Sequence, residues 1–227
     1  DRIPESTKQL MYYSDGTLPY VPLVPLNGQG VAYNKTIFRE LGIAEPKNRI
    51  EFLAACETIK NAGIVPLNYQ GGPKDSWGLR FFVDPMYPYF DKYYAEDGHW
   101  DKMNTNKKKY SDVAFYEKGL TNLMEYIELG YVNENYMETT FDMTKSGFAN
   151  GDFAMCLVAE WIVGAVAAIN PDFEMGFFPL PMEDDKEGVI ASFIGTGISV
   201  WNDSPNKDAA LDFIDFLCSV ESQIKFY

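Results

Sequence analysis

The sequence has little of what metal binding, redox chemistry or nucleophilic catalysis usually requires. It contains one histidine, His99, so neither a histidine-based metal site nor a Ser-His catalytic arrangement is expected. Three cysteines, Cys56, Cys156 and Cys218, lie in separate apolar segments without the spacing of a metal or redox motif. We interpret them as buried, unreactive thiols and expect neither a metal nor a cofactor. His99 follows a polar segment beside Trp100 and is interpreted as a surface residue.

Basic residues are also scarce. The chain has 19 Lys and Arg against 33 Asp and Glu, which leaves a formal net charge of −14 at pH 7. Such a field repels polyanions, so nucleic acid is not an expected partner. One basic cluster, at 107–109, is interpreted as a solvated loop. The sequence also lacks an apolar run of membrane-spanning length.

Phosphate-binding and calcium-binding motifs are missing as well. The Gly-Gln-Gly and Gly-Thr-Gly runs at 28–30 and 195–197 are too short for a dinucleotide-binding motif. The acidic segment 182–188 lacks the spacing of a calcium loop and is interpreted as a solvated loop. Paired carboxylates for glycoside hydrolysis stay open, because some pair always fits among 33 acidic residues.

Aromatic residues, in contrast, are plentiful at 15% of the chain, enough for a stacking surface in addition to a core. Short apolar runs at 64–68, 154–158 and 173–178 predict strands, and they alternate with segments of helical periodicity. This alternation indicates an α/β chain. Asn34 is a predicted N-cap, Gly63 a predicted helix end, and Ser204 or Asn206 the predicted N-cap of the last helix. A further predicted helix begins after Ser111 as N-cap. Its apolar stripe comprises Val113, Tyr116, Leu120, Leu123, Met124 and Ile127.

Four segments then carry a family pattern, in order and at fitting spacing. Residues 15–38 read DGTLPYVPLVPLNGQGVAYNKTIF, and residues 51–66 read EFLAACETIKNAGIVP. Residues 148–161 read FANGDFAMCLVAEW, and the fourth segment runs from FFPLP at 177–181 through GTG at 195–197 to ESQ at 221–223. Together they resemble the extracellular solute-binding proteins of ABC importers, in particular family 1, which binds sugars.

This resemblance implies an α/β, periplasmic-binding-protein-like (type II) fold of two lobes with the ligand in the cleft between them. Residues 1–27 would be a partial first lobe, 28–193 the second lobe, and 194–227 the return to the first lobe. The opening strand-helix-strand units of the family and its later helices have no counterpart in the sequence. We therefore expect one nearly complete lobe and parts of the other.

A sugar ring has apolar C–H faces and a rim of hydroxyls, so its site needs aromatic platforms beside neutral or acidic hydrogen-bonding groups. Trp161 follows a predicted strand and opens a helix, a position that points into a cleft, although a core tryptophan is the alternative. Trp77 follows a polar Gly-Pro loop with Asp75, and here stacking and core packing stay equally open. Glu160 could accept two hydroxyls, or serve only as a helix N-terminal carboxylate.

The two predicted crossings between lobes supply the other candidates. Asn27 and Gln29 lie on the first crossing, and many family members carry an aromatic residue at the position of Gln29. Gly195 and Thr196 lie on the return crossing, where a glycine lets the backbone approach a ligand, although a strand bulge explains the glycine as well.

The resemblance and the missing catalytic groups together predict a binding protein and no enzyme. The expected function is to bind a neutral carbohydrate, in particular an oligosaccharide, and to deliver it to the permease subunits of an ABC importer. The expected location is extracellular, on the cell surface as a lipoprotein or in the periplasm, with a lipid anchor outside this chain as the only membrane contact. A glycoside hydrolase with paired carboxylates and a lectin-like adhesion module are the alternatives.

Overall fold

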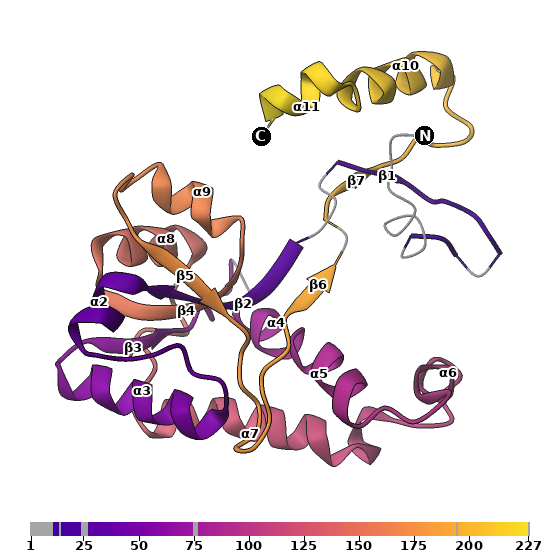
Figure 1. The fold of residues 1–227 in the computed structure, drawn as a ribbon. Coiled ribbons are helices and arrows are strands. Elements are labelled where there is room, and N and C mark those ends of the chain that lie inside the picture. Colours follow the sequence, from indigo (N-terminus) through magenta and orange to yellow (C-terminus); the bar gives the residue numbers. More distant parts are fainter. Residues whose placement is uncertain (1–10, 14, 24–26, 75–76, 194, 227) are drawn as a thin grey trace. The chain divides into compact units, whose positions relative to one another are not determined.

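The computed structural model describes residues 11–13, 15–23, 27–74, 77–193 and 195–226 of the chain (Figure 1). Its internal contacts divide the chain into two compact units. Unit 2 comprises Gly28–Ala191, and unit 1 comprises Asp1–Asn27 together with Ser192–Tyr227.

A mixed sheet forms the centre of unit 2. Its strand order is β3-β4-β2-β5, with β2 (Asn27–Asn34), β3 (Val65–Asn68), β4 (Phe153–Ala159) and β5 (Met175–Phe178), and β6 (Ala191–Phe193) pairs with β2. β3 runs parallel to β4, whereas β2 runs antiparallel to both β4 and β5. Every residue of β4 is buried, as its continuous apolar sequence predicts for a strand covered on both faces.

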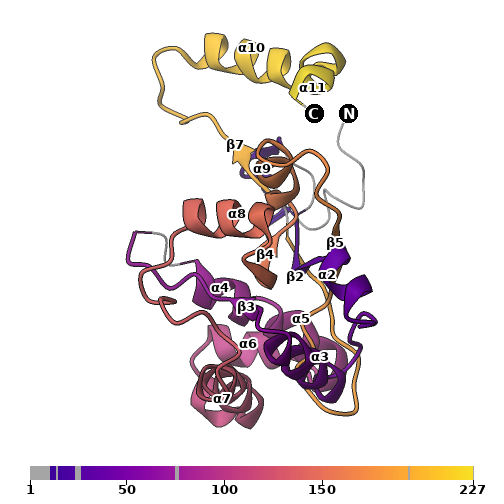
Figure 2. The same ribbon diagram turned by 90° about the vertical axis from the view of Figure 1, so that its left-hand side faces the viewer.

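Helices cover both faces of this sheet. Both views place α8 and α9 on one face and α3 and α7 on the other (Figures 1 and 2). The helical segments of unit 2 are α2 (Lys35–Glu40), α3 (Arg49–Asn61), α4 (Gly78–Val83), α5 (Met86–Tyr93), α6 (His99–Asn104), the 3-10 turn η1 (Tyr110–Asp112), α7 (Ala114–Glu128), α8 (Phe141–Asn150) and α9 (Ile162–Ala167).

The structure confirms the predicted helix start at Asn34 and the predicted helix end at Gly63. Asn34 caps α2, because its Oδ1 accepts hydrogen bonds from the backbone N–H groups of Thr36 and Ile37 at 2.9 and 3.2 Å. Gly63 follows α3 with a φ of 79°, a left-handed conformation that glycine adopts without strain. Such positions depend on neighbouring residues only, which is why the sequence predicts them.

Unit 1 contains two short strands and two helices among its described residues. β1 (Val21–Pro22) pairs antiparallel with β7 (Gly197–Ile198), and the helices are α10 (Lys207–Leu217) and α11 (Val220–Phe226). Asn206 precedes α10 as predicted, but its side chain makes no capping hydrogen bond. No helix in the described part of the chain is long and apolar enough to cross a membrane.

The predicted start and apolar face of α7 are wrong in part. The helix begins after Val113, since the residues around Ser111 form the turn η1 instead. Leu120 and Met124, expected in the core, are 45% and 54% exposed. The buried face of α7 instead includes Gly119, Asn122, Leu123 and Tyr126.

Two contacts explain this rotation of α7. Nδ2 of Asn122 donates to the backbone oxygen of Met182 at 2.9 Å, so a polar residue is satisfied inside the unit. A Cβ at Gly119 would lie 2.2 Å from Cε of Met86, which shows how closely α7 approaches α5. The spacing of apolar residues in the sequence predicts neither contact.

The prediction that His99 lies on the surface is also wrong. The residue is 2% exposed, and its ring centroid lies 4.5 Å from that of Phe90 and 4.9 Å from that of Trp100. Within the described ranges neither ring nitrogen has a hydrogen-bond partner. The contact with Phe90 of α5, which the polar sequence around His99 does not reveal, helps to bury this histidine. Cys56 and Cys156, in contrast, are buried as predicted, and burial raises the pKa of both thiols.

The acidic loop 182–188 is not solvated throughout, because Glu183 is buried. Its Oε2 accepts from Lys186 Nζ at 2.8 Å and from the hydroxyl of Tyr94, and its Oε1 accepts from Lys118 Nζ at 3.3 Å. Burial alone would raise the pKa of this carboxyl. The hydrogen bonds from Lys186, Tyr94 and Lys118 outweigh that effect and lower the pKa to about 2.

Replacing Glu183 with glutamine (E183Q) is therefore expected to reduce the free energy of unfolding at pH 7. We expect a loss of about 1–2 kcal/mol, since both lysines stay partly exposed and solvent screens them. The pKa is lowered in the folded state, so the stabilisation is present above about pH 4.5 and is lost as the pH falls toward 2. Urea unfolding of E183Q and of the unmodified protein between pH 7 and pH 3 measures this. The difference between their free energies of unfolding should become smaller below pH 4.5. A difference that stays constant with pH would contradict this account.

Candidate functional site

Trp161 lies where β4 gives way to α9. It is the N-cap residue of α9 and is 43% exposed, at a strand-to-helix turn as predicted. Its ring centroid lies 4.9 Å from that of Phe141, at an interplanar angle of 71°, and 5.8 Å from that of Phe81. The indole is thus held by aromatic neighbours while almost half of the residue stays open to solvent.

Trp77 occupies the matching position at the start of α4, as its N-cap residue, and is 50% exposed. Its ring stacks on that of Phe81 with a centroid distance of 6.2 Å and an interplanar angle of 24°. The guanidinium of Arg80 lies 5.2 Å from the indole centroid and is held by Asp84, with an Nε to Oδ2 distance of 3.0 Å. The structure therefore brings both predicted tryptophans to the ring of one buried phenylalanine.

A buried hydrogen bond holds the segment before α4 against the rest of unit 2. The backbone N–H of Tyr69 donates to Oδ1 of Asn133 at 2.7 Å, and both residues are buried. The start of α4 approaches this segment so closely that a Cβ at Gly78 would lie 2.0 Å from the backbone oxygen of Gln70. Because Trp77 directly precedes Gly78, this close approach fixes where its indole can lie.

Glu160 is tied to the start of β2 through two hydrogen bonds. Oε2 accepts from the backbone N–H of Gly28 at 2.5 Å, and the N–H of Glu160 donates to the oxygen of Gly28 at 3.1 Å. One carboxylate oxygen of Glu160 is thus engaged by the backbone of β2. Glu160 directly precedes Trp161 in the chain, at the turn between β4 and α9.

Gln29 lies opposite Ala159 in the antiparallel pairing of β2 and β4, next to the Glu160 position. Gln29 is 2% exposed, and its Oε1 has no hydrogen-bond partner within the described ranges. A buried amide oxygen without a partner is costly, which marks this end of the sheet as polar and incompletely satisfied.

The other predicted site residues lie outside the described residues or in unit 1. Asp75 lies outside the described residues. Asn27, Gly195 and Thr196 belong to unit 1, where the backbone oxygen of Thr196 accepts from the N–H of Leu23 at 2.9 Å. The aromatic cluster of unit 2 comprises Trp161 and Trp77 with Phe81, Phe141 and Arg80. Its last three members were not predicted. The spacing of four residues between Trp77 and Phe81 on one helix was a usable signal, whereas Phe141 comes from a distant helix.

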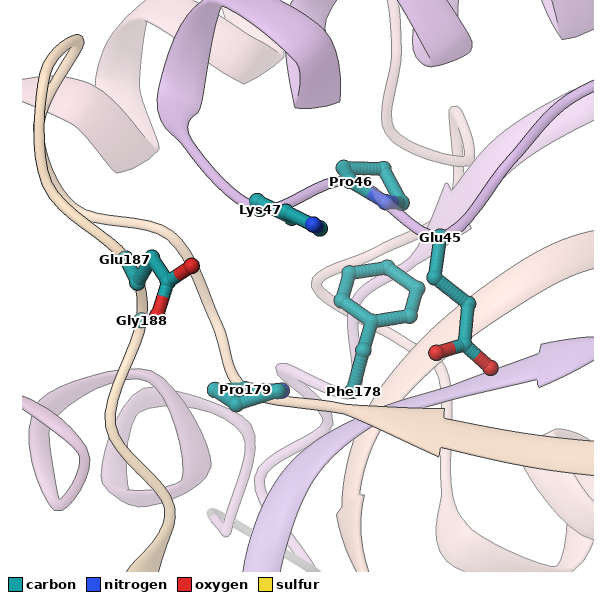
Figure 3. Close-up of a pocket in the computed structure, with 7 residues that line it drawn as sticks. All are labelled: Glu45, Pro46, Lys47, Phe178, Pro179, Glu187 and Gly188. Atoms are coloured by element: carbon teal, nitrogen blue, oxygen red, sulfur yellow. The ribbon is translucent and has the colours of Figure 1, made fainter.

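A small pocket of unit 2 lies elsewhere, between the end of β5 and the segment before α3 (Figure 3). Its volume is about 180 Å³, and Phe178 and Pro179 face Pro46 and Lys47 across it. This volume lies below the usual 300–1,000 Å³ of small-molecule sites, so the pocket is too small for an oligosaccharide. Groups of three or more possible metal ligands are not found among the residues that the structure describes.

Comparison with known proteins adds a family and a fold. The model of the family "bacterial extracellular solute-binding protein" matches residues 3–224. The multiple sugar-binding protein of Streptococcus mutans serotype c is 24% identical over 208 residues, which are 91% of this chain and 49% of that protein. The melibiose/raffinose/stachyose-binding protein MelE of Bacillus subtilis is 26% identical over 198 residues, which are 83% of this chain and 44% of that protein.

The structural likeness extends over nearly the whole chain. A sugar transporter of Bacillus licheniformis, solved in complex with stachyose, matches with a TM-score of 0.80 at 18% identity over 98% of this chain and 58% of that one. This likeness confirms the predicted α/β, periplasmic-binding-protein-like fold. The chain spans about half the length of the curated relatives that it matches.

Proposed function

Because the chain belongs to the bacterial extracellular solute-binding protein family, we propose that its protein binds a neutral oligosaccharide and delivers it to the permease of an ABC importer. The observation that carries this proposal is the aromatic cluster of unit 2, in which Trp161 and Trp77 both contact Phe81 and both stay about half exposed. The two curated relatives are named for binding sugars, which supports the same ligand class.

The chemistry of this cluster fits a sugar. The apolar faces of a pyranose stack on indole rings. In this proposal Oε1 of Glu160 accepts a hydrogen bond from a ligand hydroxyl, while Oε2 keeps its bond to Gly28. Arg80 is paired with Asp84, so the group that covers part of Trp77 adds no net charge. A neutral ligand therefore suits the cluster better than an anion does.

Further parts of the proposal rest on the family. We assign unit 2 to the predicted second lobe, 28–193, and unit 1 to 1–27 and 194–227. Asn27, Gln29, Gly195, Thr196 and Asp75 remain proposed ligand contacts. An extracellular location, on the cell surface or in the periplasm, and a binding role without catalysis complete the proposal.

A thermal-shift screen of the complete protein tests the proposed ligand class. Neutral oligosaccharides such as raffinose and stachyose should raise the melting temperature, because a ligand that binds only the folded state stabilises it. Short peptides and sugar phosphates should not. Stabilisation by peptides alone would contradict the proposal, and turnover of a chromogenic glycoside would favour a glycoside hydrolase instead.

A further inference from the structure

A second pocket of unit 2 is large enough for a small organic ligand and contains none of the proposed sugar contacts. It has a volume of about 510 Å³, within the usual range for small-molecule sites. Its walls come from α5, from the segment before α7, from the first turns of α7 and from the loop after β5. We call it the α5–α7 pocket.

The base of the α5–α7 pocket is apolar and aromatic. Phe90 and Val113 line it and are 4% and 8% exposed. Phe115 also lines it, and its ring stacks on Tyr89 with a centroid distance of 5.4 Å and an interplanar angle of 8°. The ring of Tyr94 lies 5.4 Å from that of Phe115 and is partly exposed. A flat apolar body would find aromatic surfaces here.

The acidic groups of the α5–α7 pocket are already engaged. Both oxygens of Glu183 accept hydrogen bonds, from Lys118 on one side and from Lys186 and Tyr94 on the other. Oδ2 of Asp112 accepts from the backbone N–H of Lys109 at 2.8 Å. Glu183 therefore offers a ligand little unused acceptor capacity, and one oxygen of Asp112 is engaged.

The basic groups, in contrast, keep unused donors. Lys118 makes one contact, at 3.3 Å to Glu183, so its ammonium retains further N–H donors, and its side chain is 56% exposed. Within the described ranges the side chain of Lys108 has no ion pair and no hydrogen bond of its own. The lining itself has two lysines, Lys108 and Lys118, beside two carboxylates, Glu183 and Asp112, so it is balanced in charge although the whole chain has a net charge of −14.

We infer that the α5–α7 pocket binds a small monocarboxylate with a flat apolar body, of the arylalkanoate class. The body would lie against Phe90, Val113 and Phe115, and the carboxylate would meet the ammonium groups of Lys118 and Lys108. A sugar acid is expected to bind more weakly, because its ring hydroxyls lose hydration beside Phe90 and Val113, whereas a flat arene loses none there. This site is independent of the proposed sugar site.

Titration calorimetry of the complete protein with 3-phenylpropionate tests this inference. We expect 3-phenylpropionate to bind and the neutral analogue 3-phenylpropanol to bind at least tenfold more weakly. Glucuronate, which has the carboxylate on a polar ring, should give no measurable binding. Absence of binding by 3-phenylpropionate, or equal binding of 3-phenylpropanol, would overturn the inference.

Two variants locate the binding. Lys118→Gln should weaken 3-phenylpropionate binding at least fivefold, and Glu183 keeps Lys186 and Tyr94 in that variant, so the loop stays attached. Ala114→Phe, at an exposed pocket-lining position, should abolish binding by filling the pocket. Lys35→Gln, on the exposed surface of α2, is the matched control and should change nothing.

The readouts separate this site from the proposed sugar site. Oligosaccharide affinity should be unchanged in all three variants, so a failure of either proposal leaves the other measurable. Unchanged 3-phenylpropionate affinity in both Lys118→Gln and Ala114→Phe, with circular dichroism showing folded proteins, would place the carboxylate elsewhere and overturn the inference.

Discussion

Replacing Trp161 with alanine is expected to weaken oligosaccharide binding by at least tenfold. Trp161 is 43% exposed, and its ring contacts those of Phe141 and Phe81. Truncating such an aromatic anchor typically costs about 2 kcal/mol or more of binding free energy. Titration calorimetry of the complete protein, with the sugar that gives the largest thermal shift, measures the effect.

Two further variants make the Trp161 result specific. Trp161→Phe keeps a smaller aromatic platform and should retain part of the affinity. Trp201→Ala removes a tryptophan that is 70% exposed in unit 1 and belongs to no proposed contact, so its affinity should match that of the unmodified protein. Equal affinity of Trp161→Ala and Trp201→Ala would remove Trp161 from the site.

Replacing Gly78 with alanine is expected to destabilise the protein by about 3 kcal/mol or more, the scale of severe overpacking. The added Cβ would lie 2.0 Å from the backbone oxygen of Gln70 and 2.6 Å from its carbonyl carbon. Both atoms belong to the backbone, so a change of side-chain rotamer cannot relieve the clash. The start of α4 must move, and Trp77 must move with it. Urea unfolding monitored by circular dichroism measures the stability.

Gly164 provides the matched control for this prediction. It also lies in a short helix, α9, but a Cβ there would meet no atom within 4 Å. Gly164→Ala should leave the stability unchanged or raise it by about 0.5–1 kcal/mol, because alanine is the better helix former. If both variants lost the same stability, the close approach of α4 to Gln70 would not be the cause.

The sequence predicted those parts of the fold and the site that depend on neighbouring residues. Asn34 as a helix cap, the buried strand β4 and the turn that carries Trp161 all follow from short patterns. Trp161 and Trp77 were singled out by their positions after polar or strand segments. The family pattern over four segments then gave the fold, because it records the order of elements along the chain.

The parts that failed depend on contacts between distant segments. The buried face of α7 is set by Asn122 and Met182, and Glu183 is buried because lysines and a tyrosine from other elements satisfy it. His99 is buried by aromatic rings that its polar neighbours in the sequence do not indicate. In the candidate site, Phe81 and Phe141 were missed although they hold the two tryptophans, since only the fold brings α4, α8 and α9 together.

A crystal structure of the complete protein with a bound neutral oligosaccharide tests the central claim most directly. We predict that the apolar face of one sugar ring lies over the indole of Trp161 and that a ring hydroxyl donates to Oε1 of Glu160. A sugar bound with Trp161 and Trp77 both open to solvent would contradict the proposed site.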